Sequence, residues 1–309
     1  MQYYKGTKEI QLKHTVVALG KFDGLHRGHQ RLFEQLKAYG RQGYQTVVFT
    51  FDFHPLSLLS GKPQQLIYTR EERRRIVEEM GIDVLVEYPF TQETAHMPAE
   101  TFVEEVLVRD LDVQVIVVGN DFHFGYQRAG DVNLLKSMAW RFGYRVESCE
   151  KVCEDGVEIS ATQIRDHIRE GRMEAATRLL GRPYSISGTV IHGKGNGHKV
   201  FSMPTANLAP APVKLLPPTG VYASMVQVGG ELYRGVTNIG FNPTISDHNV
   251  LRVETFIQDF NRSIYDQEIS IRLYTHLRGE QKFDSLEALK AQMALDLQKA
   301  NAWFDACGC

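Results

Sequence analysis

Short apolar segments alternate with amphipathic ones over the first half of the chain. These apolar segments are rich in Val, Ile and Phe, and they show no alternation between apolar and polar positions. Strands buried on both faces belong to parallel sheets, and the stretches between them are long enough to cross over as helices. The pattern therefore predicts an open α/β domain. Its predicted strands are residues 15–20, 45–51, 82–88, 113–119 and 144–150.

The pattern changes near residue 181. Two helical segments between residues 160 and 180 end at Gly181, and Pro183 follows, which together are stop signals for a helix. Beyond them the chain has a succession of β-type segments, with Gly229 and Gly230 placed as a two-residue hairpin turn. We therefore expect one domain over residues 1–182 and a second over 183–309, the latter a small antiparallel β-barrel.

A single amphipathic helix is predicted to close the chain and to pack on the barrel. Asp284 and Glu287 have the spacing of a capping pair. Apolar residues then recur at helical spacing. They are Leu286, Leu289, Met293 and Leu297.

Composition and charge exclude several classes of protein. Of the 309 residues, 43% are hydrophobic and 23% are charged, values typical of a folded globular protein. The net charge of −2, without a block of Lys and Arg, argues against nucleic-acid binding. No stretch approaches the roughly 20 apolar residues of a membrane span, and the first residues lack the apolar core of a signal peptide. We expect a cytoplasmic protein with no nucleic-acid or membrane partner.

A glycine-rich turn joins the first predicted strand to a helix. His26 and His29 lie at the start of that helix. Free N–H groups and the positive end of the helix dipole attract phosphate there, and imidazoles add hydrogen-bond donors. Gly20, Gly24 and Gly28 let the backbone approach a polyphosphate without a Cβ clash. The sequence thus predicts a triphosphate-binding site at this turn.

The string GKFDGLHRGH, residues 20–29, resembles the signature of the nucleotidylyltransferase superfamily, which has a Rossmann-like fold. Within that superfamily it resembles the FMN adenylyltransferase domain of bacterial riboflavin kinase/FAD synthetases. The resemblance implies that this turn binds ATP and that both of its histidines are catalytic. The ATP-binding residues that it implies are Gly20, Phe22, Asp23, Gly24, His26, Gly28 and His29.

Three later strings follow in the order of that family, at residues 49–55, 118–131 and 159–165. Ala161 stands where the family usually has a second serine, so one hydroxyl donor worth about 0.5–1.5 kcal/mol is lost, which predicts a weakened but working site. The resemblance implies that the first two strings border the flavin and that the third binds phosphate. The implied flavin residues are His54, Pro55, Asp121, Phe122 and Gly125, and the phosphate residues are Ser160, Thr162 and Arg165.

Residues 192–208 resemble the riboflavin kinase motif that ends in PTAN. In that family a glycine-rich loop covers the ATP phosphates, while Thr205 and Asn207 would hold Mg²⁺, a hard cation that prefers oxygen ligands. Glu254 occupies the place of the family's catalytic carboxylate, which takes the proton from the riboflavin 5′-hydroxyl. The ATP-binding residues implied for the kinase are Gly193, Gly195, Gly197, His198, Thr205 and Asn207.

The kinase motif departs from the family in one stretch. His198 replaces an arginine, and Ser202 and Met203 replace a glycine and an aromatic residue. Arginine offers a permanent bidentate phosphate contact, whereas histidine is mostly neutral at cytoplasmic pH. We therefore expect weaker phosphate binding in this loop, with Lys199 supplying part of the charge.

The resemblance covers nearly the whole chain and implies a bifunctional transferase. The second domain would phosphorylate riboflavin to FMN, and the first would convert FMN into FAD with release of pyrophosphate, each step using ATP and Mg²⁺. An alternative keeps FAD synthesis alone, with the barrel as a flavin-binding or regulatory module. A third hypothesis is a flavin-sensing regulator without catalysis. Other adenylyl- and cytidylyltransferases share the paired histidines but lack the later strings.

Overall fold

The computed structural model describes residues 1–52, 65–192, 205–241 and 251–308. His54, Pro55, Gly193, Gly195, Gly197 and His198 lie outside these ranges. By their internal contacts the residues form two compact units, Met1–Ala161 and Thr162–Cys309. The barrel strands begin at Tyr184, close to the predicted boundary between residues 182 and 183, whereas the two preceding helices group with the barrel. The functional boundary between the domains stays a prediction.

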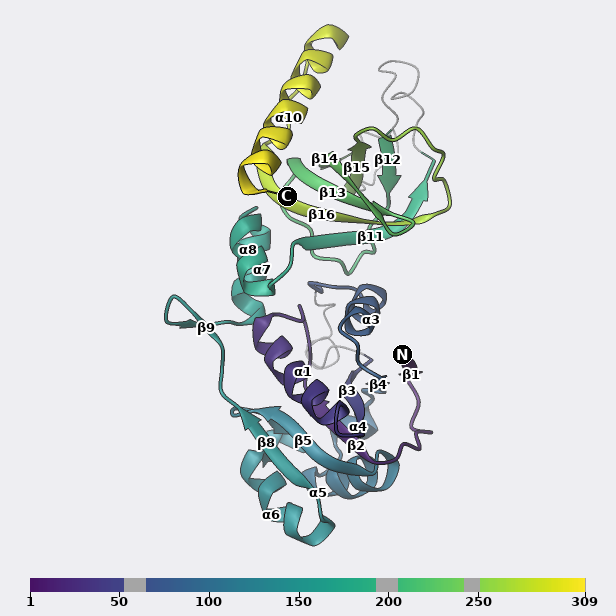
Figure 1. The fold of residues 1–309 in the computed structure, drawn as a ribbon, viewed down its shortest axis with the longest axis vertical. Coiled ribbons are helices and arrows are strands. Elements are labelled where there is room, and N and C mark those ends of the chain that lie inside the picture. Colours follow the sequence, from purple (N-terminus) through teal and green to yellow (C-terminus); the bar gives the residue numbers. More distant parts are fainter. Residues whose placement is uncertain (53–64, 193–204, 242–250, 309) are drawn as a thin grey trace. The chain divides into compact units, whose positions relative to one another are not determined.

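A parallel sheet in the order β1-β4-β3-β2-β5-β8 forms the centre of the first unit (Figure 1). All five predicted strands are confirmed. The sequence reasoning missed β1, which is short and polar, yet it pairs in parallel with β4. The strands are β1 (Gln2–Lys5), β2 (Thr15–Leu19), β3 (Gln45–Phe51), β4 (Val84–Tyr88), β5 (Val113–Gly119) and β8 (Arg145–Cys149).

Helices cover the sheet of the first unit on both faces, as the uniformly apolar strands require. Helix α1 (Arg27–Gly40) packs on β2, β3 and β5 through Leu32, Phe33 and Leu36. The segment η1 (Phe102–Asp110), which is π-helical, packs against the other face. The remaining elements of this unit are α3 (Arg70–Glu79), α4 (Gln92–Ala95), α5 (Ala99–Thr101), β6 (His123–Phe124), η2 (Tyr126–Arg128), β7 (Gly130–Asp131), α6 (Val132–Phe142), β9 (Cys153–Glu154) and β10 (Val157–Glu158).

In the second unit the strands close into an antiparallel barrel in the order β11-β12-β15-β14-β13-β16, which confirms the predicted fold. Gly229 and Gly230 form the expected turn between two of them, with φ of 56° and 93°. The strand β12 was not predicted because it lies within the PTAN motif. The strands are β11 (Tyr184–Ile191), β12 (Thr205–Leu208), β13 (Gly220–Val228), β14 (Glu231–Phe241), β15 (Leu251–Ile257) and β16 (Glu268–Arg278).

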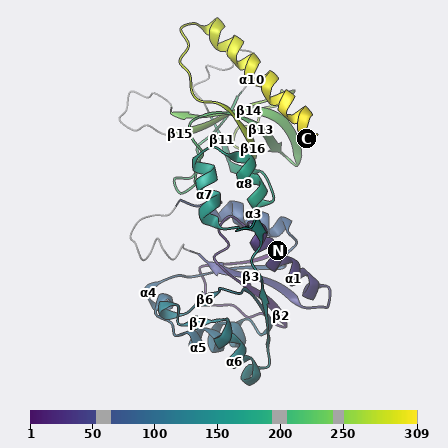
Figure 2. The same cartoon turned by 90° about the vertical axis from the view of Figure 1, so that its left-hand side faces the viewer.

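Helices α7 (Ala161–Arg169) and α8 (Met173–Leu180) precede the barrel, and α8 packs on β11 and β16 (Figure 2). The closing helix α10 (Leu286–Cys307) contacts β13, β14 and β16. The predicted cap was wrong by one residue, because the hydroxyl of Ser285, and not Asp284, accepts the N–H of Ala288 at 3.1 Å.

The predicted apolar stripe of α10 is present, but it does not form the main contact with the barrel. The buried residues of the helix are Asp296, Ala300 and Phe304. Leu286 is 40% exposed. The other three residues of the stripe, Leu289, Met293 and Leu297, line a cavity beside the barrel.

Candidate active sites

The order of the strands places a crevice in the first unit. The chain runs from β2 through β3 to β4 on one side and continues in β5 and β8 on the other. In open α/β sheets, ligands bind at the carboxyl ends of the strands where the winding direction changes. Here that point lies between β2 and β5, and the turn with the paired histidines follows β2 directly.

The turn between β2 and α1 has a strained backbone that its buried side chains hold in place. Phe22 and Leu25 adopt left-handed φ values of 47° and 45°, and Gly24 has φ of 82°. Such a conformation costs about 1–2 kcal/mol for a residue other than glycine. Phe22 and Leu25 are fully buried, and burying such a side chain gains about 1.5–3 kcal/mol. Burial therefore outweighs the strain, and the turn is fixed before any ligand binds.

The two histidines form one compact pair at the start of α1. Their rings stack with centroids 3.7 Å apart, and the His29 ring meets Phe22 edge-on at 5.2 Å. His26 is the N-cap residue, and its own side chain makes no capping hydrogen bond. A Cβ at Gly28 would lie 3.1 Å from the His26 ring, so glycine lets that ring fold against the helix. The pair thus lies beside the first N–H groups of the helix.

Burial keeps both imidazoles uncharged near neutral pH. It lowers the pKa of His26 from 6.5 to about 4. Burial, with a smaller contribution from His26, also lowers the pKa of His29 well below 6.5. Among the described residues, neither Nδ1 atom has a hydrogen-bond partner, although both atoms are buried. Unpaired buried polar atoms are costly, so a ligand that supplies the missing partner gains affinity.

A cavity of about 270 Å³ lies at this point of the sheet. It brings together residues from four separate parts of the sequence, namely the turn after β2, the end of β5, the end of β8 and the segment before α7. Eight residues predicted for ATP or flavin line it. They are Gly20, Phe22, His26, Gly28, His29, Asp121, Phe122 and Ser160.

The other described residues that the sequence predicts for the adenylyltransferase site do not line this cavity. Gly24 adopts the positive φ that the turn before α1 requires. Gly125 packs closely on Ala99, and a Cβ at position 125 would lie 2.7 Å from Ala99. Asp23 instead accepts the N–H of Ile67 at 3.3 Å. Thr162 and Arg165 lie in α7, which groups with the second unit.

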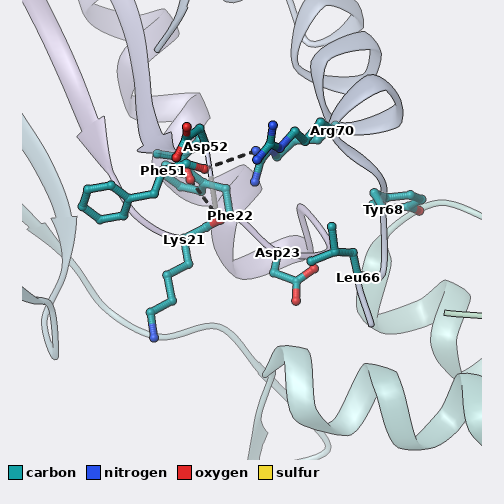
Figure 3. Close-up of a pocket in the computed structure, with 10 residues that line it drawn as sticks. Lys21, Phe22, Asp23, Phe51, Asp52, Leu66, Tyr68 and Arg70 are labelled. Carbon is teal, nitrogen blue, oxygen red and sulfur yellow. Dashed lines mark hydrogen bonds between the residues drawn. The ribbon is translucent and has the colours of Figure 1, made fainter. Parts of the chain in front are cut away.

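Asp23 borders a second, much smaller cavity of about 30 Å³ at the carboxyl ends of β2 and β3 (Figure 3). The lining is strongly charged, with Lys21, Asp52 and Arg70 among its residues. Thr50 ties the two strand ends by donating to the carbonyl of Lys21 at 3.1 Å. The space holds about one water molecule, so this small cavity by itself cannot hold a nucleotide.

In the second unit, the register of three strands brings polar residues to one face. Glu254 on β15 pairs directly with Asn207 on β12 and with Asn238 on β14. Paired residues in antiparallel strands share a face, and so do residues two apart in a strand, which adds Thr205. Thr205 donates to Oε1 of Glu254 at 2.5 Å. The predicted catalytic and metal-binding residues of the kinase are therefore neighbours.

This polar group adjoins a cavity of about 410 Å³ between the barrel and α10. Thr205, Asn238 and Glu254 line it together with apolar residues of the barrel and the helix, whereas Asn207 is not among the lining residues. The size and the mixed lining suit a small organic ligand with one reactive polar end. The apolar residues are Val221, Val236, Phe256, Phe283, Leu289, Met293 and Leu297.

A buried ion pair fixes the helix over this cavity. Arg278, at the end of β16, donates to Asp296 of α10 with Nη2–Oδ2 at 2.7 Å and Nε–Oδ1 at 3.0 Å. Gln292 donates to the same carboxylate at 2.9 Å. The sequence reasoning missed this pair and Asn238. A charged residue between Met293, Leu297 and Ala300 on an otherwise apolar helical stripe was the available signal for Asp296.

Comparisons with known proteins match both domains of this chain. A family described as FAD synthetase matches residues 8–163, and one described as riboflavin kinase matches residues 180–304. A bifunctional riboflavin kinase/FMN adenylyltransferase of Listeria monocytogenes is 38% identical over 94% of this chain and 92% of its own length. The chain belongs to this bifunctional family. The Pseudomonas fluorescens member is 34% identical over 98% of this chain and 97% of its length, and the Escherichia coli K12 member is 35% identical over 94% and 92%.

The fold of the whole chain resembles that of a solved structure. A crystal structure described as a macrolide-efflux protein from Streptococcus pneumoniae is 30% identical, with a TM-score of 0.85 over 97% of this chain and 98% of that one. In the part of the chain that the structure describes, none of the helices has the length and apolarity to cross a membrane. Both family domains are thus present in one chain, which favours the bifunctional hypothesis over FAD synthesis alone.

The buried imidazoles predict that the first unit loses stability in mild acid. His26 takes up a proton near pH 6.5 in the unfolded chain but only near pH 4 in the fold. The unfolded state therefore binds more protons between these values, and the free energy of unfolding decreases as the pH falls through this window. Urea unfolding followed by hydrogen exchange in β2 should show this slope, and His26→Asn should flatten it. Equal slopes in the two proteins would contradict a buried, neutral His26.

Proposed function

We propose that this chain phosphorylates riboflavin to FMN in the barrel domain and joins FMN to the AMP part of ATP in the sheet domain. The observation that carries the proposal is the stacked pair His26 and His29, which is uncharged, lacks hydrogen-bond partners at Nδ1 among the described residues, and lines the cavity between β2 and β5. A cytoplasmic location stays a prediction from the sequence.

In FAD formation, a phosphate oxygen of FMN attacks the α-phosphorus of ATP, and the bond to the departing pyrophosphate breaks. No covalent enzyme intermediate is needed. His26, His29 and the N–H groups at the start of α1 donate hydrogen bonds to the negative charge that gathers on pyrophosphate. We assign Ser160, Thr162 and Arg165 to the same phosphates, and Asp121 and Phe122 to the flavin.

In FMN formation, the 5′-hydroxyl of riboflavin attacks the γ-phosphorus of a second ATP, and ADP leaves. Glu254 accepts the hydroxyl proton, and Thr205, whose hydroxyl donates to that carboxylate, keeps it oriented. We assign the apolar cavity between the barrel and α10 to the flavin ring, because its lining buries a large flat ligand beside Glu254. The glycine-rich loop, residues 193–198, would cover the phosphates of ATP.

The oxygen atoms around Glu254 fit Mg²⁺. Thr205 offers a hydroxyl, Asn207 an amide carbonyl and Glu254 a carboxylate, and a hard cation prefers oxygen. Among the described residues, no group of three His, Cys, Asp or Glu side chains could hold a metal ion. Mg²⁺ commonly takes many of its ligands from substrate phosphates. When bound, Mg²⁺ would neutralise phosphate charge, with Thr205 and Asn207 holding it.

The purified full chain tests this proposal directly. Incubated with riboflavin, ATP and Mg²⁺, it should form FMN first and FAD afterwards, as separated by chromatography. Supplied FMN should give FAD and pyrophosphate without ADP. FAD from FMN but no FMN from riboflavin would refute the kinase assignment and favour a barrel that only binds flavin. Failure of both reactions would refute the enzyme hypothesis.

A further inference from the structure

The charge of the cavity between β2 and β5 is unusual for a site that receives a polyanion. Three carboxylate residues line it, namely Asp121, Glu150 and Glu158. The two lining histidines are uncharged near neutral pH because burial lowers their pKa. Among the described residues that line this cavity, Lys151 is the one cation. The position of Lys151 therefore determines how much negative charge faces a nucleotide in this cavity.

Lys151 is shared between two of these carboxylates. Its Nζ lies 2.7 Å from Oε1 of Glu158 and 2.9 Å from Oδ2 of Asp121. Asp121 follows β5, Lys151 follows β8, and Glu158 is the last residue of β10, so one ammonium joins three separate segments of the cavity wall. Glu158 and then Asp121 raise the pKa of Lys151, which keeps it charged.

We propose that Lys151 is a nucleotide-positioning residue of the adenylyltransferase site. By neutralising Asp121 and Glu158 where they border the cavity, it allows the anionic phosphates of ATP to enter. This inference rests on the proposed FAD synthesis and adds to it a residue outside the motifs that the sequence singles out. Without the ammonium, two unpaired carboxylates would repel the incoming nucleotide.

The exposure of the three side chains argues against a mainly structural role. The Lys151, Glu158 and Asp121 side chains are 34%, 46% and 65% exposed. Ion pairs exposed to this degree contribute little to the stability of a fold, because water screens them. Repulsion of an anion at the same place is screened less once the ligand has displaced that water. Loss of Lys151 should therefore change binding more than folding.

Steady-state kinetics of FAD formation test the proposal in Lys151→Met. We expect the KM for ATP to rise about tenfold or more and kcat to change less than about threefold, since the lost charge acts on entry of the nucleotide. Riboflavin phosphorylation by the same preparation should not change. Lys8→Met is the matched control, because Lys8 forms an ion pair with Glu93 at 2.9 Å in the same unit and does not line the cavity.

A second substitution separates electrostatic positioning from simple damage. Lys151→Met combined with Glu158→Gln removes the excess negative charge and should return most of the lost affinity for ATP, and Lys151→Arg should stay near the wild type. About 0.5 M KCl should also reduce the difference in the KM for ATP between Lys151→Met and the wild type, because salt screens the repulsion. An unchanged KM for ATP, or a defect that Glu158→Gln does not relieve, would overturn the proposal. A wild-type chain that makes no FAD would refute the function itself.

Discussion

Replacing His29 with alanine is expected to lower the rate of FAD formation by about a hundredfold or more. The His29 ring is fixed by stacking on His26 and by its edge contact with Phe22, so its N–H needs no reorganisation as charge develops on the leaving pyrophosphate. Removing one preorganised donor of this kind typically costs about 10²–10³ in kcat. The effect should appear in kcat more than in the KM for ATP, because the interaction strengthens as the leaving group separates.

The kinase activity of the His29→Ala protein is an internal control. Riboflavin phosphorylation by His29→Ala should stay intact, because the predicted kinase residues belong to the second compact unit. His96→Ala is a matched control, since His96 is an exposed histidine of the first unit that does not line the cavity. Equal loss of both activities in His29→Ala would contradict separate sites. Full FAD synthesis would remove His29 from the mechanism.

Replacing Glu254 with glutamine should produce the opposite pattern. Glutamine has the same size and can still accept the hydrogen bond from Thr205, but it cannot take the proton of the riboflavin hydroxyl. A general base typically contributes about 10²–10⁴ to the rate, so riboflavin phosphorylation should fall by that factor. FAD formation from supplied FMN should remain at the wild-type rate. Initial rates with riboflavin and with FMN as separate substrates give both measurements.

Glu231→Gln is the control for this substitution. Glu231 lies on β14 of the same barrel, is exposed and pairs with Arg262 at 2.8 Å, so its loss should leave both activities unchanged. A Glu254→Gln variant with a normal kinase rate would show that the carboxylate does not act as the base. A higher KM for riboflavin with an unchanged kcat would instead assign Glu254 to binding.

Together the two substitutions test whether one chain carries two independent catalysts. His26 and His29 lie at the start of α1 in the first unit, while Glu254 and Thr205 lie on adjacent strands of the second. Each variant should therefore accumulate a different flavin when supplied with riboflavin and ATP. We expect FMN to accumulate with His29→Ala and unchanged riboflavin to remain with Glu254→Gln.

The parts of this protein that could be predicted from the sequence are those whose signal is local. The apolar runs predicted the parallel strands because a strand covered on both faces cannot expose polar residues. The turn from Gly20 to His29 was recognisable because its glycines, histidines and helix start act within one continuous string. The hairpin at Gly229 and Gly230 likewise needs only the positive φ that glycine adopts without strain.

Contacts between residues far apart in the sequence could not be predicted and are seen in the folded chain. Thr205 and Glu254 lie 49 positions apart, and the closing of the barrel brings their side chains to 2.5 Å. Lys151 and Asp296 looked like ordinary charged residues until their partners were placed beside them at 2.7 to 3.0 Å. The strength of an ion pair depends on distance and burial, neither of which a linear pattern contains. The reactions could therefore be predicted from the motifs, whereas the ion pairs beside the two cavities depend on how the chain packs.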